Sequence, residues 1–164
     1  GKWMEAKAYP FGALASGHGL LLAVENHCDF SGTEIARMLE AVDRPHVGAA
    51  VDTGNSFPIF SDWRADVAAM APWAFTTHFK DMRVVPSPHA GVPFAVEGCV
   101  LGEGEIDVAW IIDELRRRSP RARALRLIVE VGWPPEVAGE DSDEQLRAMT
   151  RASLDYLREC VIAS

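Results

Sequence analysis

Short apolar runs alternate with amphipathic segments along the chain, and each run ends in a residue that can bind a metal. Runs of about six residues bounded by polar or turn residues are typical of buried parallel strands. The sequence contains four such runs, at residues 20–25, 47–52, 73–78 and 125–130. We therefore expect the four runs to form one parallel sheet.

The segments between and after these runs have apolar residues at helical spacing. In the first of them, Ile35, Met38, Leu39 and Val42 fall on one face of a helix. The spacing predicts helices over residues 33–42, 62–70, 107–117 and 142–160. Strands that alternate with helices indicate an α/β fold with right-handed crossovers.

Side-chain size alternates along the predicted strands in a way that favours a barrel wall. On the second run, Gly48 and Ala50 share a face with Asp52, whereas the bulkier Val47 and Val51 lie on the other face. Small inward residues, with bulky ones outward under helices, suit a (β/α) barrel of the TIM type. A complete barrel has eight strands and about 250 residues. Four units predict a half or truncated barrel, which we take as a single domain over residues 1–164.

Three further features bear on partners, on the extent of the chain and on a functional loop. The outer strands of a half-barrel have unpaired edges, which predicts a homodimer or pairing with a missing N-terminal half-barrel. The first residue is Gly1 rather than Met, which is in line with a processed or truncated chain. Residues 83–105 are rich in proline and glycine, so we expect a long loop there, of the kind that often carries function.

Composition narrows the range of partners. Acidic residues outnumber basic ones by 24 to 16 among 164 residues, which gives a net charge of −8 and disfavours nucleic acid as a partner. The longest purely apolar stretch, residues 20–24, is too short to cross a membrane. Three cysteines without a CxxC pair indicate reduced thiols and a cytoplasmic protein.

The polar residues at the strand ends form the strongest candidate site. Glu25, Asp52, His78 and Glu130 follow one another at intervals of 27, 26 and 52 residues, and carboxyl ends of parallel strands meet at one edge of a sheet. One such residue alone is most often a helix cap or a turn residue. Three carboxylates and an imidazole in register would repel and lose solvation without a cation. They predict a site for Mn²⁺, Mg²⁺, Co²⁺ or Zn²⁺.

Five motifs in this order resemble one protein family. They are AVENH at 23–27, VDTGNS at 51–56, HFKD at 78–81, LGEGEID at 101–107 and LIVEV at 127–131. As a set, they resemble the C-terminal half of the barrel in the xylose isomerase-like sugar phosphate isomerase/epimerase family. The resemblance implies that the four strand-end residues bind one divalent metal ion and that the substrate is a sugar or a sugar-like molecule.

The resemblance also implies roles for the two glutamates. Those matching Glu25 and Glu130 lie on opposite faces of the substrate in the family's epimerases and act as acid and base, while the metal stabilises an enediolate. We expect Asn55, Lys80 and Arg83 to contact substrate, with pairing of Lys80 to Asp81 as the alternative. Asn55 stands where many epimerases of the family have a histidine, which weakens an assignment as a ketose 3-epimerase.

Three other functions stay open on the sequence. A dehydratase of the 3-dehydroshikimate type would use the same ligands to expel a hydroxyl group. An apurinic endonuclease shares the barrel but is disfavoured by Asn55 and by the acidic charge. A half-barrel without activity of its own would serve as a folding or interaction unit.

Overall fold

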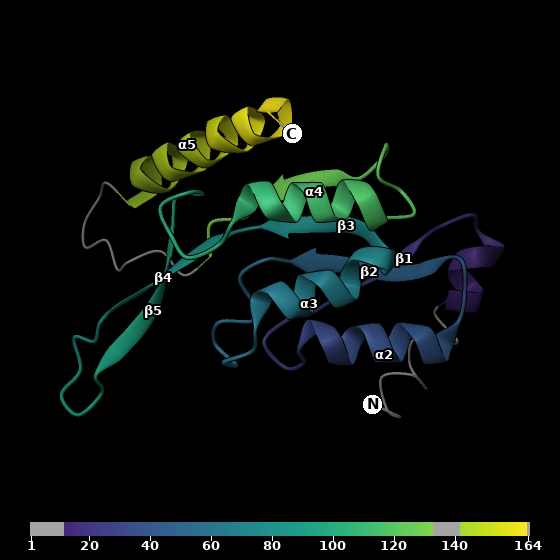
Figure 1. The fold of residues 1–164 in the computed structure, drawn as a ribbon, viewed down its shortest axis with the longest axis horizontal. Helices are drawn as coiled ribbons and strands as arrows, with labels where there is room; N and C mark the ends of the chain where they lie inside the picture. The colour runs from purple at the N-terminus through teal and green to yellow at the C-terminus, as the bar shows by residue number, and fades with distance from the viewer. Residues whose placement is uncertain (1–11, 133–141, 164) are drawn as a thin grey trace.

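A four-stranded parallel sheet forms the centre of the molecule. The computed structural model describes residues 12–132 and 142–163 (Figure 1). The strands lie in the order β1-β2-β3-β6, so each new strand is added on the same side. Their bounds are Leu22–Glu25 for β1, Val47–Asp52 for β2, Ala74–Phe79 for β3 and Arg126–Val129 for β6. The predicted parallel sheet is confirmed, with shifts of one or two residues at strand ends.

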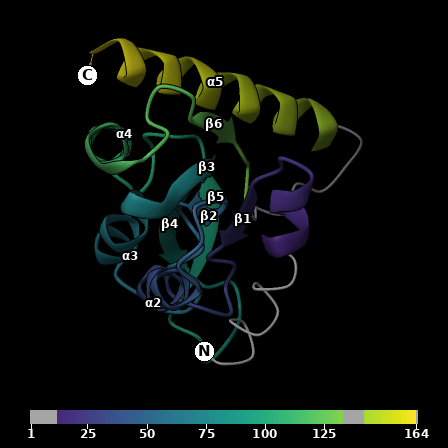
Figure 2. The same ribbon diagram turned by 90° about the vertical axis from the view of Figure 1, so that its right-hand side faces the viewer.

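Helices follow the strands and cover one side of the sheet (Figure 2). They are α2 (Gly32–Val42), α3 (Trp63–Met70), α4 (Val108–Arg118) and α5 (Ser142–Ala163), with a short 3₁₀ turn η1 (Ala71–Trp73) before β3. Ser31, Asp62 and Asp107 cap the first three helices by accepting backbone N–H groups. Among the described residues, no helix has the length and apolar character that crossing a bilayer requires.

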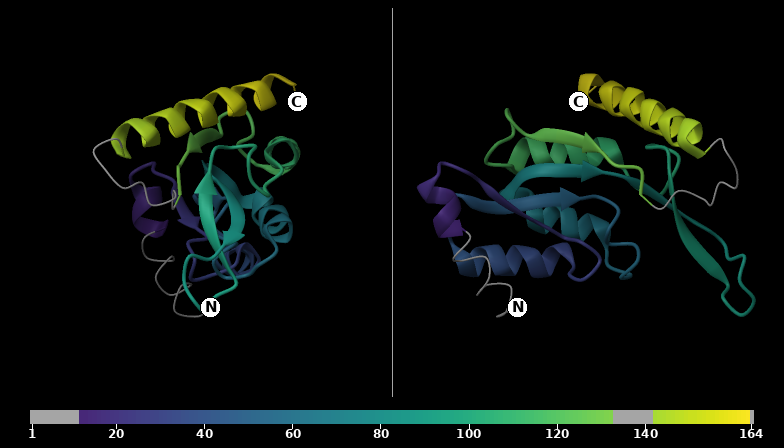
Figure 3. Two further views of the ribbon diagram at one scale, coloured as in Figure 1. Left: turned by 90° about the vertical axis from the view of Figure 1, so that its left-hand side faces the viewer. Right: turned by 180° about the vertical axis from the view of Figure 1, so that it is seen from behind.

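The core lies between the sheet and these helices. Val51 and Phe79 have no exposed surface on the helix side of β2 and β3, where Ile35 and Ile111 pack from α2 and α4. The opposite side of the sheet is less covered by helices (Figure 3). Ile128, in strand β6, is 41% exposed. Four βα units with one covered side are half of a TIM-type barrel, as the alternation of side-chain size predicts.

The prediction of a long loop over residues 83–105 is wrong for much of that segment. Strands β4 (Asp81–Pro86) and β5 (Phe94–Cys99) form an antiparallel hairpin that projects from the body of the molecule (Figure 1). Val84 lies opposite Val96, and Arg83 lies opposite Glu97 and forms an ion pair with it. These cross-strand pairs stabilise an extended backbone despite the flanking prolines and glycines.

Candidate metal centre

The parallel register brings the four predicted ligands to one edge of the sheet. Glu25 and Asp52 are the last residues of β1 and β2, and Asp52 lies opposite His78 of β3. Glu130 directly follows β6 and donates its backbone N–H to the carbonyl of Phe79 at 2.9 Å. One ligand atom from each of the four side chains lies within 4.8 Å of the others. This is the arrangement that the sequence spacing predicts.

His78 lies in the middle of the carboxylates. Its Nδ1 is 3.3 Å from Oε1 of Glu25, 3.2 Å from Oε2 of Glu130 and 3.8 Å from Oδ2 of Asp52. The imidazole nitrogen is therefore within 3.8 Å of a carboxylate oxygen from each of the other three strand ends. We refer to these four residues, a candidate site for a divalent ion, as the metal centre.

Asp52 is the most buried of the four, with no exposed side-chain surface. Its Oδ1 accepts the backbone N–H groups of Gly54 at 2.9 Å and Asn55 at 3.0 Å. Oδ2 is buried and has no partner in hydrogen-bonding geometry, although Nζ of Lys80 is 3.0 Å away. Burial raises the pKa of Asp52 to about 6, against the lowering effects of Lys80 and of the two backbone donors. An oriented, under-satisfied carboxylate oxygen among three other donors fits a divalent cation.

Lys80 contacts the metal centre rather than Asp81. Its Nζ is 2.9 Å from Oε1 of Glu130 and 3.3 Å from Oδ1 of Asn55. Burial acts to lower the pKa of Lys80, but the carboxylates of Asp52 and Glu130 outweigh it and raise that pKa. Lys80 is therefore a cation in direct contact with two of the candidate ligands.

Asn55 also lies at the metal centre. Its amide Nδ2 donates to Oε1 of Glu25 at 3.2 Å, and its Oδ1 faces both Lys80 and the thiol of Cys28. The side chain is 1% exposed. It links the glutamate of β1 to the lysine that follows β3.

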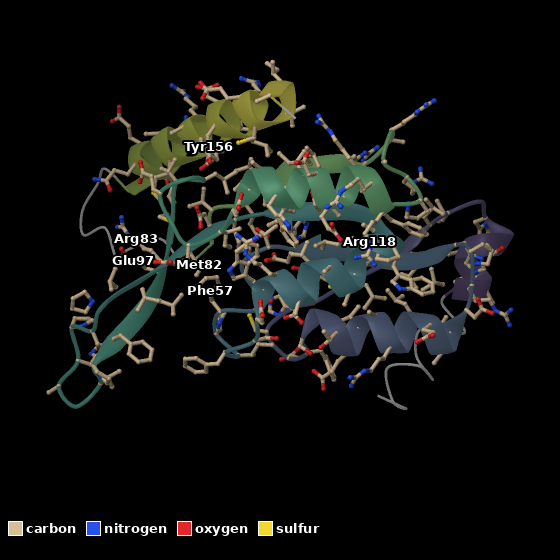
Figure 4. All side chains as sticks on the ribbon, in the orientation of Figure 1. Phe57, Met82, Arg83, Glu97, Arg118 and Tyr156 are labelled. Carbon is tan, nitrogen blue, oxygen red and sulfur yellow. The ribbon has the colours of Figure 1, made fainter. Side chains whose placement is uncertain are left out.

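Arg83 lies away from this cluster. It is on β4, and its guanidinium is paired with Glu97 on the projecting hairpin (Figure 4). The structure thus brings together six of the seven residues that the sequence singles out, and places Arg83 elsewhere in this conformation.

Two supporting residues escaped the sequence analysis. Asn26 is buried directly after Glu25, and its amide both donates to the carbonyl of Asp52 and accepts that residue's N–H. Thr53 similarly exchanges hydrogen bonds with the backbone of Lys80. Both residues lie inside the quoted motifs, beside the ligands. Each is a polar residue that directly follows a candidate ligand at a strand end, and this position in the sequence could have identified it as a supporting residue.

Asp81 organises the glycine-rich turn that follows the hairpin. Its carboxylate accepts backbone N–H groups from Gly102, Gly104 and Ile106 as well as from Met82. Burial raises the pKa of Asp81, while these four donors lower it in part. The LGEGEID motif therefore has a structural role at the end of the sheet that carries the metal centre.

A curated relative covers most of the chain. The chain is 26% identical over 140 residues to the 3-oxo-isoapionate decarboxylase of Pectobacterium atrosepticum, which is 85% of this chain and 50% of that protein. The chain thus spans about half the length of the curated relative that it matches.

Solved structures share the fold at low sequence identity. A xylose isomerase domain protein from Planctomyces limnophilus matches with a TM-score of 0.71 and 18% identity, over 97% of this chain and 53% of that chain. An L-ribulose 3-epimerase matches with a TM-score of 0.65 and 16% identity, over 97% and 53%. At this level of identity, the likeness is one of fold.

Two further structures are described as a dehydratase and as a protein with bound zinc. A probable 3-DHS dehydratase from Bacillus anthracis matches with a TM-score of 0.60 and 18% identity, over 90% of this chain and 54% of that one. A zinc-bound IOLI protein matches with a TM-score of 0.63 and 15% identity, over 94% and 55%. Epimerase, dehydratase and decarboxylase are thus all named among the similar proteins.

A family model also matches most of the chain. The model described as xylose isomerase-like TIM barrel matches residues 10–160, which includes every residue of the metal centre. The resemblance in the five motifs is confirmed, and the chain belongs to the xylose isomerase-like TIM barrel family.

Proposed function

We propose that this chain carries the metal-dependent catalytic site of a sugar or sugar-like isomerase/epimerase that acts through an enediolate. The observation that carries the proposal is the metal centre, in which three carboxylates and one imidazole from four strands converge within 4.8 Å. Glu25, Asp52, His78 and Glu130 would hold one divalent ion, Mn²⁺, Mg²⁺, Co²⁺ or Zn²⁺. When bound, such an ion supplies a Lewis acid that makes the proton beside a carbonyl more acidic.

In the proposed site, Glu25 and Glu130 carry out proton transfer. Glu25 and Glu130 lie on the outer strands of the sheet, on either side of His78, and their side chains are 29% and 44% exposed. In the proposed reaction, one carboxylate removes the proton from the carbon beside the carbonyl, and the carbon's electron pair moves into the enediolate. The other, as a carboxylic acid, returns a proton to the opposite face of that carbon and inverts it.

Asn55 and Lys80 complete the proposed site. Both contact oxygens of the metal centre, so they hold the carboxylates in place beside the substrate. Arg83 enters the proposal as a substrate contact only if the hairpin moves, since its guanidinium is paired with Glu97 in this structure.

Decarboxylation is the second candidate, and the match to 3-oxo-isoapionate decarboxylase favours it. In a 3-oxo acid, the bond between the carboxylate and the neighbouring carbon breaks, CO₂ leaves, and the electron pair forms the same kind of enolate. Glu25 or Glu130 would then protonate the carbon. The 3-dehydroshikimate dehydratase alternative also needs this enolate but loses a hydroxide with its electron pair.

A second half-barrel is part of the proposal. Strands β1 and β6 each have one unpaired edge among the described residues, and Ile128 of β6 is exposed. A second copy of this chain, or an N-terminal half-barrel, would pair with these edges and cover the substrate. Light scattering on a size-resolved sample distinguishes a dimer from a monomer, and a monomer without turnover would favour the N-terminal half-barrel.

A single experiment separates these reactions. The chain is stripped with a chelator, reloaded with Mn²⁺ and incubated in D₂O with a panel of ketoses, a 3-oxo sugar acid and 3-dehydroshikimate. We expect an epimer or an aldose that carries deuterium at the carbon beside the carbonyl, and we expect Glu130→Gln to abolish it. Release of CO₂ or formation of a dehydrated product would select the other two reactions. A metal-loaded chain that is paired in a dimer or with an N-terminal half-barrel, and that still gives no product and no exchange, would contradict the proposal.

A further inference from the structure

The side chain of Lys80 packs closely against the backbone of two glycines on its way to the metal centre. Its side chain is 4% exposed, and its stem passes Gly54 and Gly132. A Cβ atom on Gly54 would lie 2.4 Å from Cγ of Lys80, and one on Gly132 would lie 2.9 Å from Cδ. Neither glycine can therefore gain a side chain while the lysine keeps its place. This packing directs the ammonium group of Lys80 toward the metal centre and away from solvent.

The ammonium group shares oxygens with the candidate metal ligands. Its distances are 3.0 Å to Oδ2 of Asp52 and 2.9 Å to Oε1 of Glu130, and the other oxygen of Glu130 faces His78. Oδ2 of Asp52 is the oxygen that its backbone donors leave available. A divalent ion bound in this centre would therefore share at least one carboxylate oxygen with Lys80.

Charge explains why a cation is built into this position. Glu25, Asp52 and Glu130 bring three negative charges, which one lysine reduces to two. A divalent ion together with Lys80 makes the loaded centre neutral, whereas without the lysine it would keep one negative charge. A neutral centre opposes the negative charge that develops on an enediolate, or the carboxylate of an acidic substrate, less than a negative one does.

We propose that Lys80 is a resident counter-cation of the metal centre: it holds the carboxylates together before metal binds, weakens metal binding, and leaves the loaded centre neutral. The inference rests on the proposed metal-dependent function. It assigns Lys80 a positioning role rather than a direct contact to substrate. Removing one partner of a buried ion pair leaves an uncompensated charge, so the metal-free chain should depend on Lys80. Removing a positive charge beside the ion should strengthen metal binding.

The test uses the full chain and two variants that each remove one positive charge. Lys80→Met keeps the apolar stem, and Arg158→Met is the matched control, because Arg158 lies 72% exposed on α5. We expect the melting temperature of the metal-free chain to fall by about 6–12 °C in Lys80→Met. Titration with Mn²⁺ should give a dissociation constant that is lower by about tenfold or more in this variant. Arg158→Met should match the wild type in both measurements.

The opposite results are equally clear. A Lys80→Met chain that binds Mn²⁺ no more tightly than the wild type and keeps its melting temperature overturns the inference. If Lys80→Met folds only with Mn²⁺ present, the counter-cation is supported; if it never folds, Lys80→Gln is measured in its place by the same criteria.

The proposed function fails in a different way. If the wild type and Arg158→Met do not bind Mn²⁺, and Glu130→Gln behaves as they do, the metal-dependent function is wrong. The melting temperature of the metal-free Lys80→Met chain then tests only whether Lys80 holds the carboxylates together, and an unchanged value overturns that part of the inference as well.

Discussion

The inner and outer strands of the sheet contribute to the metal centre in different ways. Asp52, on the inner strand β2, has no exposed side-chain surface and is fixed by two backbone N–H groups. Glu25 and Glu130, at the outer strands β1 and β6, are 29% and 44% exposed. Burial and two backbone donors thus hold Asp52 in place on the inner strand β2, whereas the glutamates at the outer strands are accessible to solvent, as is His78 of the inner strand β3 at 28%.

The largest expected effect is on the inner strand. Asp52→Ala removes a metal ligand, frees two backbone donors and leaves the charge of Lys80 less compensated. We expect the free energy of unfolding to fall by about 2–4 kcal/mol and Mn²⁺ affinity to fall by more than about 100-fold. Urea denaturation and metal titration measure the two effects. Asp155→Ala, at a 68% exposed position on α5, is the control and should change stability by less than about 0.5 kcal/mol.

Substitutions of the glutamates at the outer strands should weaken metal binding with little loss of stability. Glu25→Gln and Glu130→Gln each remove one ligand charge, and we expect Mn²⁺ affinity to fall by about 10–100-fold. The metal-free free energy of unfolding should change by less than about 1 kcal/mol, because these side chains are partly exposed. Glu40→Gln on the exposed face of α2 serves as control. A loss of stability as large as that of Asp52→Ala would remove the distinction between inner and outer strands.

The pH dependence of the metal-free chain tests the burial of Asp52. Its pKa is raised from 3.8 to about 6, so between these values the folded chain keeps a proton that the unfolded chain has lost. This carboxyl group therefore makes the free energy of unfolding decrease as pH rises through that window, by up to about 2–3 kcal/mol. Denaturation curves at several pH values, compared between the wild type and Asp52→Asn, isolate this contribution. Identical slopes for the two proteins would show that Asp52 titrates normally.

The smallest effect is expected on the hairpin. Arg83→Gln breaks a partly exposed ion pair with Glu97, so stability should fall by less than about 1 kcal/mol and Mn²⁺ affinity should not change. If Arg83 contacts substrate, KM should rise in this variant. Glu97→Gln breaks the same pair from the other side and should leave KM unchanged. A change in metal affinity in either variant would connect the hairpin to the metal centre.

Much of the fold and of the metal centre could be predicted from the sequence. Strand β2 has the predicted bounds, and Asp62 and Asp107, predicted as the first residues of their helices, are the caps of α3 and α4. The hairpin could not be predicted in the same way, because prolines and glycines dominate the local pattern. Its strands are stabilised by cross-strand contacts such as Val84 with Val96, which the local pattern does not contain.

Lys80 illustrates where prediction from sequence ends. Its position two residues after His78 predicts a place near the site, but the adjacent Asp81 is an alternative ion-pair partner. The tertiary structure decides between them, because the carboxylate of Asp81 accepts N–H groups from Gly102, Gly104 and Ile106. The lysine side chain then runs along Gly54 to Asp52 and Glu130.

The order of apolar and polar residues along the chain is enough to predict which residues lie at the ends of the four parallel strands, and therefore which ligands share one edge of the sheet. A repeated strand and helix of nearly constant length keeps Glu25, Asp52 and His78 in register, whatever surrounds them. The burial of Asp52, the exposure of the glutamates at the outer strands and the contacts of Lys80 with Asp52 and Glu130 depend on the folded structure. Burial and charge pairing depend on groups that are distant in sequence, and the periodicity of the chain does not encode them.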